Sequence, residues 1–141
     1  MRFRGEGGAA STELAVLTPL LIGFMLLAVY AGRVVQAEAD VAHAAQEAAR
    51  AASLTGDPQA AEVAAQQTAA ANIDEGGVAC RRLLVTTDTG AFTAGGQVMV
   101  TVSCEASFAD LSLLAVPGTR SFAATAVEVI DTYRANPAGL P

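Results

Sequence analysis

Residues 8–32 read GAASTELAVLTPLLIGFMLLAVYAG, and this segment decides how the rest of the chain is organised. No charged side chain occurs from Leu14 to Gly32. As a helix this run reaches about 28 Å at ~1.5 Å per residue, which is close to the ~30 Å hydrocarbon thickness of a bilayer. Glu13 stands at the edge of the run, and a carboxylate in lipid is a candidate functional residue because its charge is costly there. The segment therefore predicts a transmembrane helix over residues 9–32 that begins beside an acid.

The same segment resembles the processing site of type IV pilin-like proteins, and in particular the TadE-like family of the tight-adherence pilus system. Such proteins have a short charged leader, a glycine at the cleavage site, a glutamate at the fifth mature position and then an apolar helix. In this chain Gly8 corresponds to the last leader residue, Ala9 to the first mature residue and Glu13 to the fifth. The apolar run with a proline and the Ala-rich continuation typical of the family are matched by Pro19 and by residues 46–52, QEAARAA.

The resemblance implies a structural role in a pilus. A prepilin peptidase would remove residues 1–8 on the cytoplasmic side, and the mature protein would assemble with other pilin subunits as a minor pilin or pseudopilin. Glu13 would pair in the membrane with the new α-amino group of a neighbouring subunit; the alternative is an interfacial acid that reaches water. Two features differ from the family pattern: Leu14 replaces a frequent aromatic residue, and Glu6 lies in a short leader.

Charge sets the expected topology and excludes one class of partner. Residues 1–8 carry two arginines and one acid, whereas residues 33–141 carry six arginines against twelve acids, a net charge of −6. Positive charge on the N-terminal side of an apolar run favours a cytoplasmic N-terminus, with the remainder exported. An acidic exported domain argues against nucleic acid, which requires a basic face.

Two other interpretations of the apolar run stay open. A cleavable secretory signal would find Ala-x-Ala-like sites near Ala37 and Ala39. However, the run is longer than the usual apolar core of about 7–15 residues in a signal peptide, and it begins with Glu13. A plain single-span anchor without pilin processing is the second alternative.

Residues 33–72 are predicted to form two alanine-rich helices outside the membrane. In the first helix, polar residues recur at spacings of four and three and so share one face: Gln36, Asp40, His43, Glu47 and Arg50. The opposite face carries small apolar residues that suit close packing: Val34, Val41, Ala45, Ala48 and Ala52. Gly56 can end this helix, Asp57 can cap the next one, and Pro58 suits its first turn. The second helix is predicted to end near Asn72.

Residues 73–134 are predicted to form a small antiparallel β domain, which makes the fold class α+β. Runs rich in β-branched residues predict three strands, at 78–87, 97–106 and 121–132. The apolar segment 107–119 is interpreted as a loop that covers one sheet edge. Residues 135–141 are interpreted as a flexible tail.

The two cysteines are predicted to form a disulfide. An antiparallel hairpin centred on Phe92 places Cys80 opposite Cys104, within reach of a disulfide across the ladder. An exported domain permits this bond, and closing the loop would contribute about 3 kcal/mol. The alternative is two reduced, buried thiols in a cytosolic protein.

The sequence offers little for catalysis or cofactor binding. His43 is the only histidine and is interpreted as a solvated surface residue, and no cysteine or histidine has zinc-ligand spacing. No serine lies in a nucleophile elbow, and no glycine pair has the context of a phosphate loop. We therefore predict a structural protein without cofactor or metal, not an enzyme. The alternative is a membrane-anchored extracytoplasmic binding module whose sheet recognises a ligand.

Overall fold

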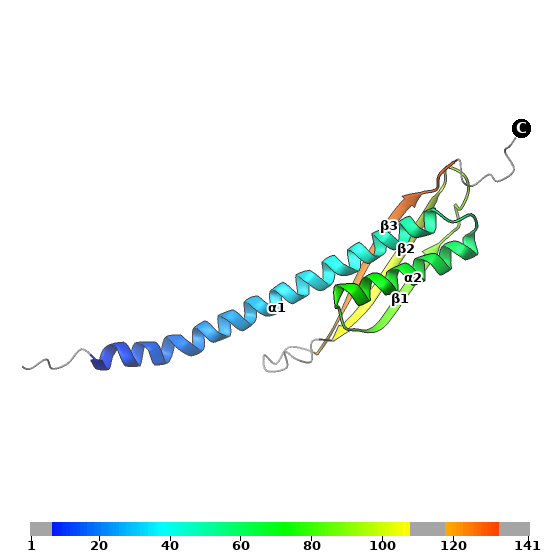
Figure 1. The fold of residues 1–141 in the computed structure, drawn as a ribbon. Coiled ribbons are helices and arrows are strands. Elements are labelled where there is room, and N and C mark those ends of the chain that lie inside the picture. The colour runs from blue at the N-terminus through cyan, green and yellow to red at the C-terminus, as the bar shows by residue number, and fades with distance from the viewer. Residues whose placement is uncertain (1–6, 108–117, 133–141) are drawn as a thin grey trace, which may run out of the picture. The chain divides into compact units, whose positions relative to one another are not determined.

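A computed structural model describes residues 7–107 and 118–132, with side chains from Glu13 onward (Figure 1). The elements in chain order are α1 (Gly7–Ser53), α2 (Pro58–Gly76), β1 (Cys80–Asp88), β2 (Gln97–Ser107) and β3 (Thr119–Val129). Two helices followed by a three-stranded antiparallel sheet confirm the predicted α+β class.

Three predicted features fall wholly or partly outside the described residues. These are the leader predicted at residues 1–8, the apolar loop predicted at 107–119 and the tail predicted at 135–141. Residues 1–6 of the leader, 108–117 of the loop and the whole tail lie outside the described residues. The described chain divides into two compact units, residues 1–34 and 35–141, which are treated separately below.

The first unit consists, as far as it is described, of the N-terminal part of α1. Its large apolar side chains are exposed, with exposed fractions of 68% for Leu20 and 72% for Phe24. The described residues contain one segment long and apolar enough to cross a membrane, and it begins at Glu13. A helix suits lipid because its backbone hydrogen bonds are all internal. The predicted single membrane span therefore corresponds to an exposed apolar helix.

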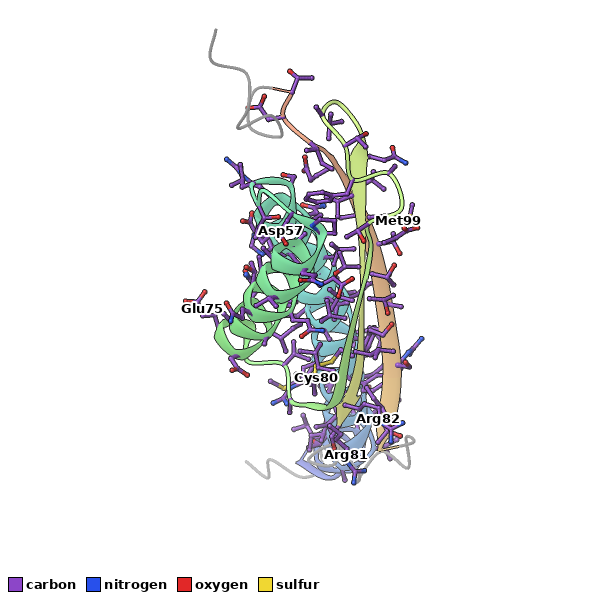
Figure 2. The ribbon with its side chains drawn as sticks, turned by 90° about the vertical axis from the view of Figure 1, so that its right-hand side faces the viewer. Asp57, Glu75, Cys80, Arg81, Arg82 and Met99 are labelled. Carbon is purple, nitrogen blue, oxygen red and sulfur yellow. A yellow bond between two sulfur atoms is a disulfide. The ribbon has the colours of Figure 1, made fainter. Side chains whose placement is uncertain are left out.

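The second unit is a sheet with both helices on one of its faces (Figures 1 and 2). The strand order is β1-β2-β3, and both neighbouring pairs are antiparallel. In β2 the side chains alternate between buried and more exposed, as expected for a strand covered on one side. The buried members face the helices: Val98, Val100, Val102, Cys104 and Ala106. The other face of the sheet has no helix on it in the part of the chain that the structure describes.

Small residues make the helix side of this core. The buried α1 residues are Ala37, Val41, Ala44, Ala45, Ala48, Ala49 and Ala52, and those of α2 are Ala61, Ala65, Ala69 and Ile73. Alanine lets helix backbones approach closely, which explains how a chain without tryptophan builds a compact core. On the opposite side of α1, Gln36, His43 and Arg50 are exposed, whereas Asp40 and Glu47 of the same predicted polar face are half-buried. Periodicity therefore predicted the packed face correctly and the solvated face in part.

The second helix begins as predicted but ends later. Asp57 is its N-cap, since its carboxylate accepts a hydrogen bond from the backbone N–H of Ala60 at 2.9 Å, and Pro58 occupies the first turn. The predicted end near Asn72 is wrong, because the helix continues to Gly76. Gly77 ends it in the left-handed conformation at φ 73°, which a glycine adopts without steric cost.

Candidate functional site

The predicted processing site lies in the first turns of α1. The helix begins at Gly7, so Gly8 and Ala9 both have helical backbone. Glu13 follows in the same helix and its side chain is exposed. Val16, one turn further on, is 73% exposed and apolar. The helix therefore carries Gly8, Ala9 and Glu13 in order along one element, at the border of the apolar run.

Pro19 lies inside the apolar part of α1, six residues after Glu13, and the helix continues through it. Proline has no amide hydrogen, so the carbonyl of Ala15 loses its usual intrahelical donor. One residue earlier, the Thr18 hydroxyl donates to the carbonyl oxygen of Leu14 at 2.6 Å. Backbone groups without partners are costly in lipid, which makes this turn a candidate contact for another helix. The sequence predicts that Pro19, like Glu13, contacts another subunit during assembly, and this role stays a prediction.

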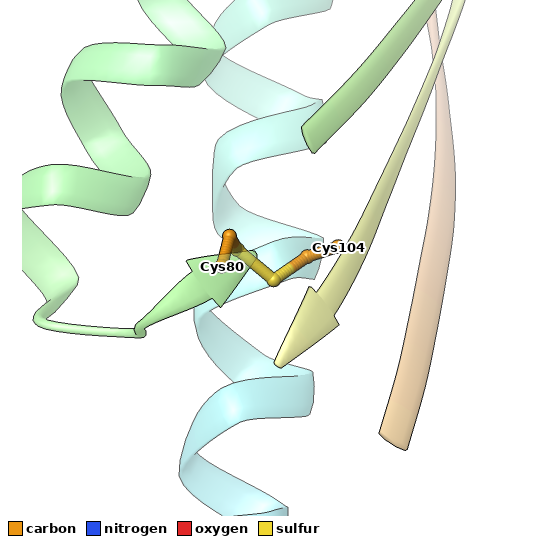
Figure 3. Close-up of a disulfide and its surroundings, with 2 residues drawn as sticks. All are labelled: Cys80 and Cys104. Carbon is orange, nitrogen blue, oxygen red and sulfur yellow. A yellow bond between two sulfur atoms is a disulfide. The ribbon is translucent and has the colours of Figure 1, made fainter. Parts of the chain in front are cut away.

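The disulfide lies in the other unit, and the structure confirms it. Cys80 at the start of β1 is bonded to Cys104 in β2, with their Cα atoms 5.5 Å apart (Figure 3). Cys104 is fully buried and Cys80 is half-buried. The bond therefore joins the first strand to the central strand on the helix-covered face of the sheet.

The predicted pairing of the two cysteines across the ladder is wrong, although the bond itself is right. Cys104 lies opposite Leu83, while Cys80 lies opposite Ala106. The register shifts between Cys80 and Arg82, so that Arg81 is an extra residue in a β-bulge. A shift of one residue turns a side chain to the other face of a sheet. The bulge therefore directs Cys80 toward the helices, where Cys104 also points.

One feature of the domain could not be found from the sequence. Asp40 was placed on the polar face of α1, but one of its carboxylate oxygens, Oδ2, is buried without a hydrogen-bond partner. Its other oxygen accepts a hydrogen bond from the Gln36 amide at 2.9 Å. A Cβ atom on Gly76 would lie 3.0 Å from Asp40 Cγ, so glycine at the end of α2 leaves room for this carboxylate. Helical periodicity cannot show which helix end packs against a polar face.

Residues 7–107 and 118–132 contain no group of three or more His, Cys, Asp or Glu side chains that could hold a metal ion. An open, shallow hollow lies at the β1–β2 loop. Asp88 lines it and accepts a hydrogen bond from the Gly90 N–H at 2.9 Å, as in a turn.

The fold and the N-terminal segment define a class: a protein with one N-terminal apolar helix that carries an α+β domain braced by a disulfide. Within this class, residues 8–50 match the model of a family described as TadE-like protein. The match includes Gly8, Ala9, Glu13 and Pro19 and ends inside α1, and it confirms the resemblance predicted for this segment. No curated protein and no solved structure matches the chain.

Proposed function

We propose that this protein is a minor pilin or pseudopilin, a structural subunit for the assembly of a tight-adherence pilus or a related secretion apparatus. The observation that carries the proposal is the order of residues on α1, where Gly8, Ala9 and Glu13 stand directly before an exposed apolar helix. The match of residues 8–50 to the TadE-like family supports it. The proposal assigns the chain no catalytic role.

In this proposal, cleavage and membrane retention prepare the subunit. A prepilin peptidase cuts after Gly8 on the cytoplasmic side and leaves the α-amino group of Ala9. The helix from Ala9 stays in the membrane with the domain outside, where an oxidising compartment allows the Cys80–Cys104 bond.

The role proposed for Glu13 follows from the cost of its charge in lipid. A carboxylate near the hydrocarbon region is stabilised by a cation, and the α-amino group of an adjacent mature subunit supplies one. A buried ion pair adds little net stability, but loss of one partner leaves an unpaired charge and is strongly unfavourable. The pair therefore acts mainly by selecting one axial register of neighbouring helices. It would favour extraction of the subunit into the filament and fix the axial position of neighbouring helices.

The cleavage step is tested by replacing Gly8 with phenylalanine. A bulky side chain at the cut should block maturation, so that N-terminal sequencing of the membrane-purified variant finds residue 1 instead of Ala9. Gly7→Phe adds the same side chain one position earlier and is the control, with maturation at Ala9 retained. An unchanged N-terminus at Ala9 in Gly8→Phe would rule out Gly8 as the processing site.

The assembly step is tested by Glu13→Gln, which keeps the size of the side chain and removes its charge. We expect unchanged membrane insertion but at least a roughly tenfold loss of the protein from purified filaments, since breaking a buried ion pair costs about 3–5 kcal/mol and each 1.4 kcal/mol is tenfold. Glu38→Gln removes an exposed charge further along α1 and should have no effect. Normal incorporation of Glu13→Gln would refute the pairing.

A second candidate function is a membrane-anchored binding module. It is favoured by the helix-free face of the sheet, where Leu84 is 61% exposed, Val127 47% and Val129 69%. A binding module would function without cleavage at Gly8. The Gly8→Phe variant therefore separates the two candidates, since a fully functional uncleaved protein would favour the second.

A further inference from the structure

The outer edge of β3 has no partner strand among residues 7–107 and 118–132. β3 pairs only with β2, whereas β1 at the other side of the sheet lies against α2 (Figure 1). The β2–β3 pairing runs from Thr119 to Val129 without a register shift. The strand contains no proline and no lysine, two residues with which proteins commonly protect a free edge.

The backbone groups on this free edge can be assigned residue by residue. Both backbone groups of Ile130 point toward the β2 side of the strand. Its N–H donates a hydrogen bond to the carbonyl oxygen of Gly96 at 2.9 Å, and its C=O accepts one from the N–H of Gly95 at 3.1 Å. Because alternate residues of a strand direct these groups to opposite sides, the even-numbered residues of β3 also face β2. The odd-numbered residues therefore present their N–H and C=O groups to the free edge: Thr119, Ser121, Ala123, Thr125, Val127 and Val129.

A second copy of β3 matches this edge in one antiparallel register. With Ala124 opposite Ala124 of the second copy, each edge-facing residue meets another edge-facing residue. The hydrogen-bonded pairs are then Thr119 with Val129, Ser121 with Val127 and Ala123 with Thr125, each formed twice by symmetry. Shifting the register by two residues in either direction leaves one of the end residues, Thr119 or Val129, without a partner.

The same register brings opposite charges together. Arg120 lies opposite Glu128 of the second copy, and Glu128 lies opposite Arg120, in non-hydrogen-bonded pairs where Cα atoms approach to about 4.5 Å. Arg120 is exposed, lies 6.0 Å from the centre of the Phe122 ring and forms no ion pair in the described part of the chain. Glu128 is half-buried and likewise forms no ion pair there. Opposite charges directly across an antiparallel pair stabilise it.

We propose that two copies of this protein associate through antiparallel pairing of their β3 strands, which forms one continuous sheet across both domains. Ala124 lies on the two-fold axis, and the Arg120–Glu128 pairs on either side select the register. This self-association goes beyond the pilin role and does not depend on cleavage at Gly8.

Cysteine cross-linking of the full chain tests the register. In Ala124→Cys the two introduced residues face each other at a Cα separation that fits the disulfide range of about 4.4–6.8 Å, so mild oxidation should give a covalent dimer on a non-reducing gel. Ala126→Cys is the matched control, because alanine 126 lies on the same face and is equally half-buried. In the proposed register the two 126 positions lie about 13 Å apart along the strand, so this variant should stay monomeric. Cross-linking of both variants, or of neither, would overturn the proposal.

Charge reversal tests the pairing without cysteines. Arg120→Glu and Glu128→Arg each place like charges opposite each other twice, so each should abolish the dimer seen by sedimentation of the detergent-solubilised full chain. The double variant Arg120→Glu/Glu128→Arg exchanges the charges and should restore it. Arg82→Glu, on the strand at the other side of the sheet, should leave the dimer unchanged. A double variant that stays monomeric while its circular dichroism is native would contradict the register.

Discussion

Replacing Gly96 with alanine is expected to destabilise the domain by about 3 kcal/mol, at the upper end of the cost of overpacking. The added Cβ would collide with the backbone carbonyl oxygen of Ala91 and lie 2.9 Å from the Thr93 hydroxyl. A backbone atom cannot move aside as the tip of a flexible side chain can. The collision therefore forces the whole β1–β2 loop to rearrange.

The loop around Gly96 is closed by hydrogen bonds that this rearrangement would break. The Gly96 N–H bonds to Thr93 O at 2.8 Å, and its carbonyl accepts from the Ile130 N–H at 2.9 Å. The second bond continues the β2–β3 ladder beyond Gln97. Loss of both bonds would loosen the loop and the adjoining end of β3 together.

The effect of Gly96→Ala is measured as the free energy of unfolding of the detergent-solubilised full chain in urea. Gly56→Ala is the control, because nothing lies within 4 Å of the added Cβ there and the backbone is not left-handed. Gly95 has φ 74°, so Gly95→Ala should cost an intermediate ~1–2 kcal/mol through backbone strain. Equal stability of the Gly96 and Gly56 variants would show that the loop is not packed as described.

Local chemistry made much of this fold predictable. The faces of α1 follow from helical periodicity, and the start of α2 follows from Asp57 and Pro58, whose roles depend only on their neighbours. The strands follow from β-branched runs to within three residues of their ends; the largest error is in β3, which was predicted to end at residue 132 and ends at Val129. These features involve interactions between residues close in sequence, which explains why a single sequence suffices to find them.

Strand register was not predictable in the same way. Cys104 lies opposite Leu83, three positions from the predicted partner, because the hairpin is centred between Thr93 and Ala94 and not at Phe92. The bulge at Arg81 then changes the partner and the face of Cys80. Nothing in the residues near Arg81 signals an extra residue. Register is set by packing against α1 and α2, which is a property of the assembled core.

The candidate sites also differ in how far the sequence predicts them. The spacing from Gly8 to Glu13 is visible in the sequence, and its match to the TadE-like family extends over residues 8–50. The edge of β3 and its paired charges became visible only when the order of the strands was known. Arg120 and Glu128 are eight residues apart in one strand. They come to lie opposite each other only when a second copy of the strand pairs with the first in the antiparallel direction.

Removing both cysteines, as Cys80→Ser/Cys104→Ser, is expected to lower the free energy of unfolding by about 3 kcal/mol. The bond closes a loop over a sequence separation of 24, and constraining such a loop in the unfolded chain accounts for a stabilisation of this size. A serine hydroxyl at the fully buried position 104 would add the cost of an unpaired polar group, so Cys80→Ala/Cys104→Ala measures the loop term more cleanly. Urea unfolding of oxidised wild type and of both variants provides the measurement.

The β-bulge gives this expectation a stricter test, because the bond requires Cys80 to face the helices. Deleting Arg81 alone removes the extra residue but leaves Cys80 opposite Ala106 and toward the helices, so this control variant should keep the disulfide. Deleting both Arg81 and Arg82 places Cys80 directly before Leu83 and opposite Glu105, so its side chain turns to the helix-free face, away from Cys104. The double-deletion variant should therefore contain two free thiols under oxidising conditions and should lose as much stability as the cysteine-free variants. A disulfide that still forms quantitatively after the double deletion would show that the strand can shift its register, and that the alternation of β1 does not determine the position of Cys80.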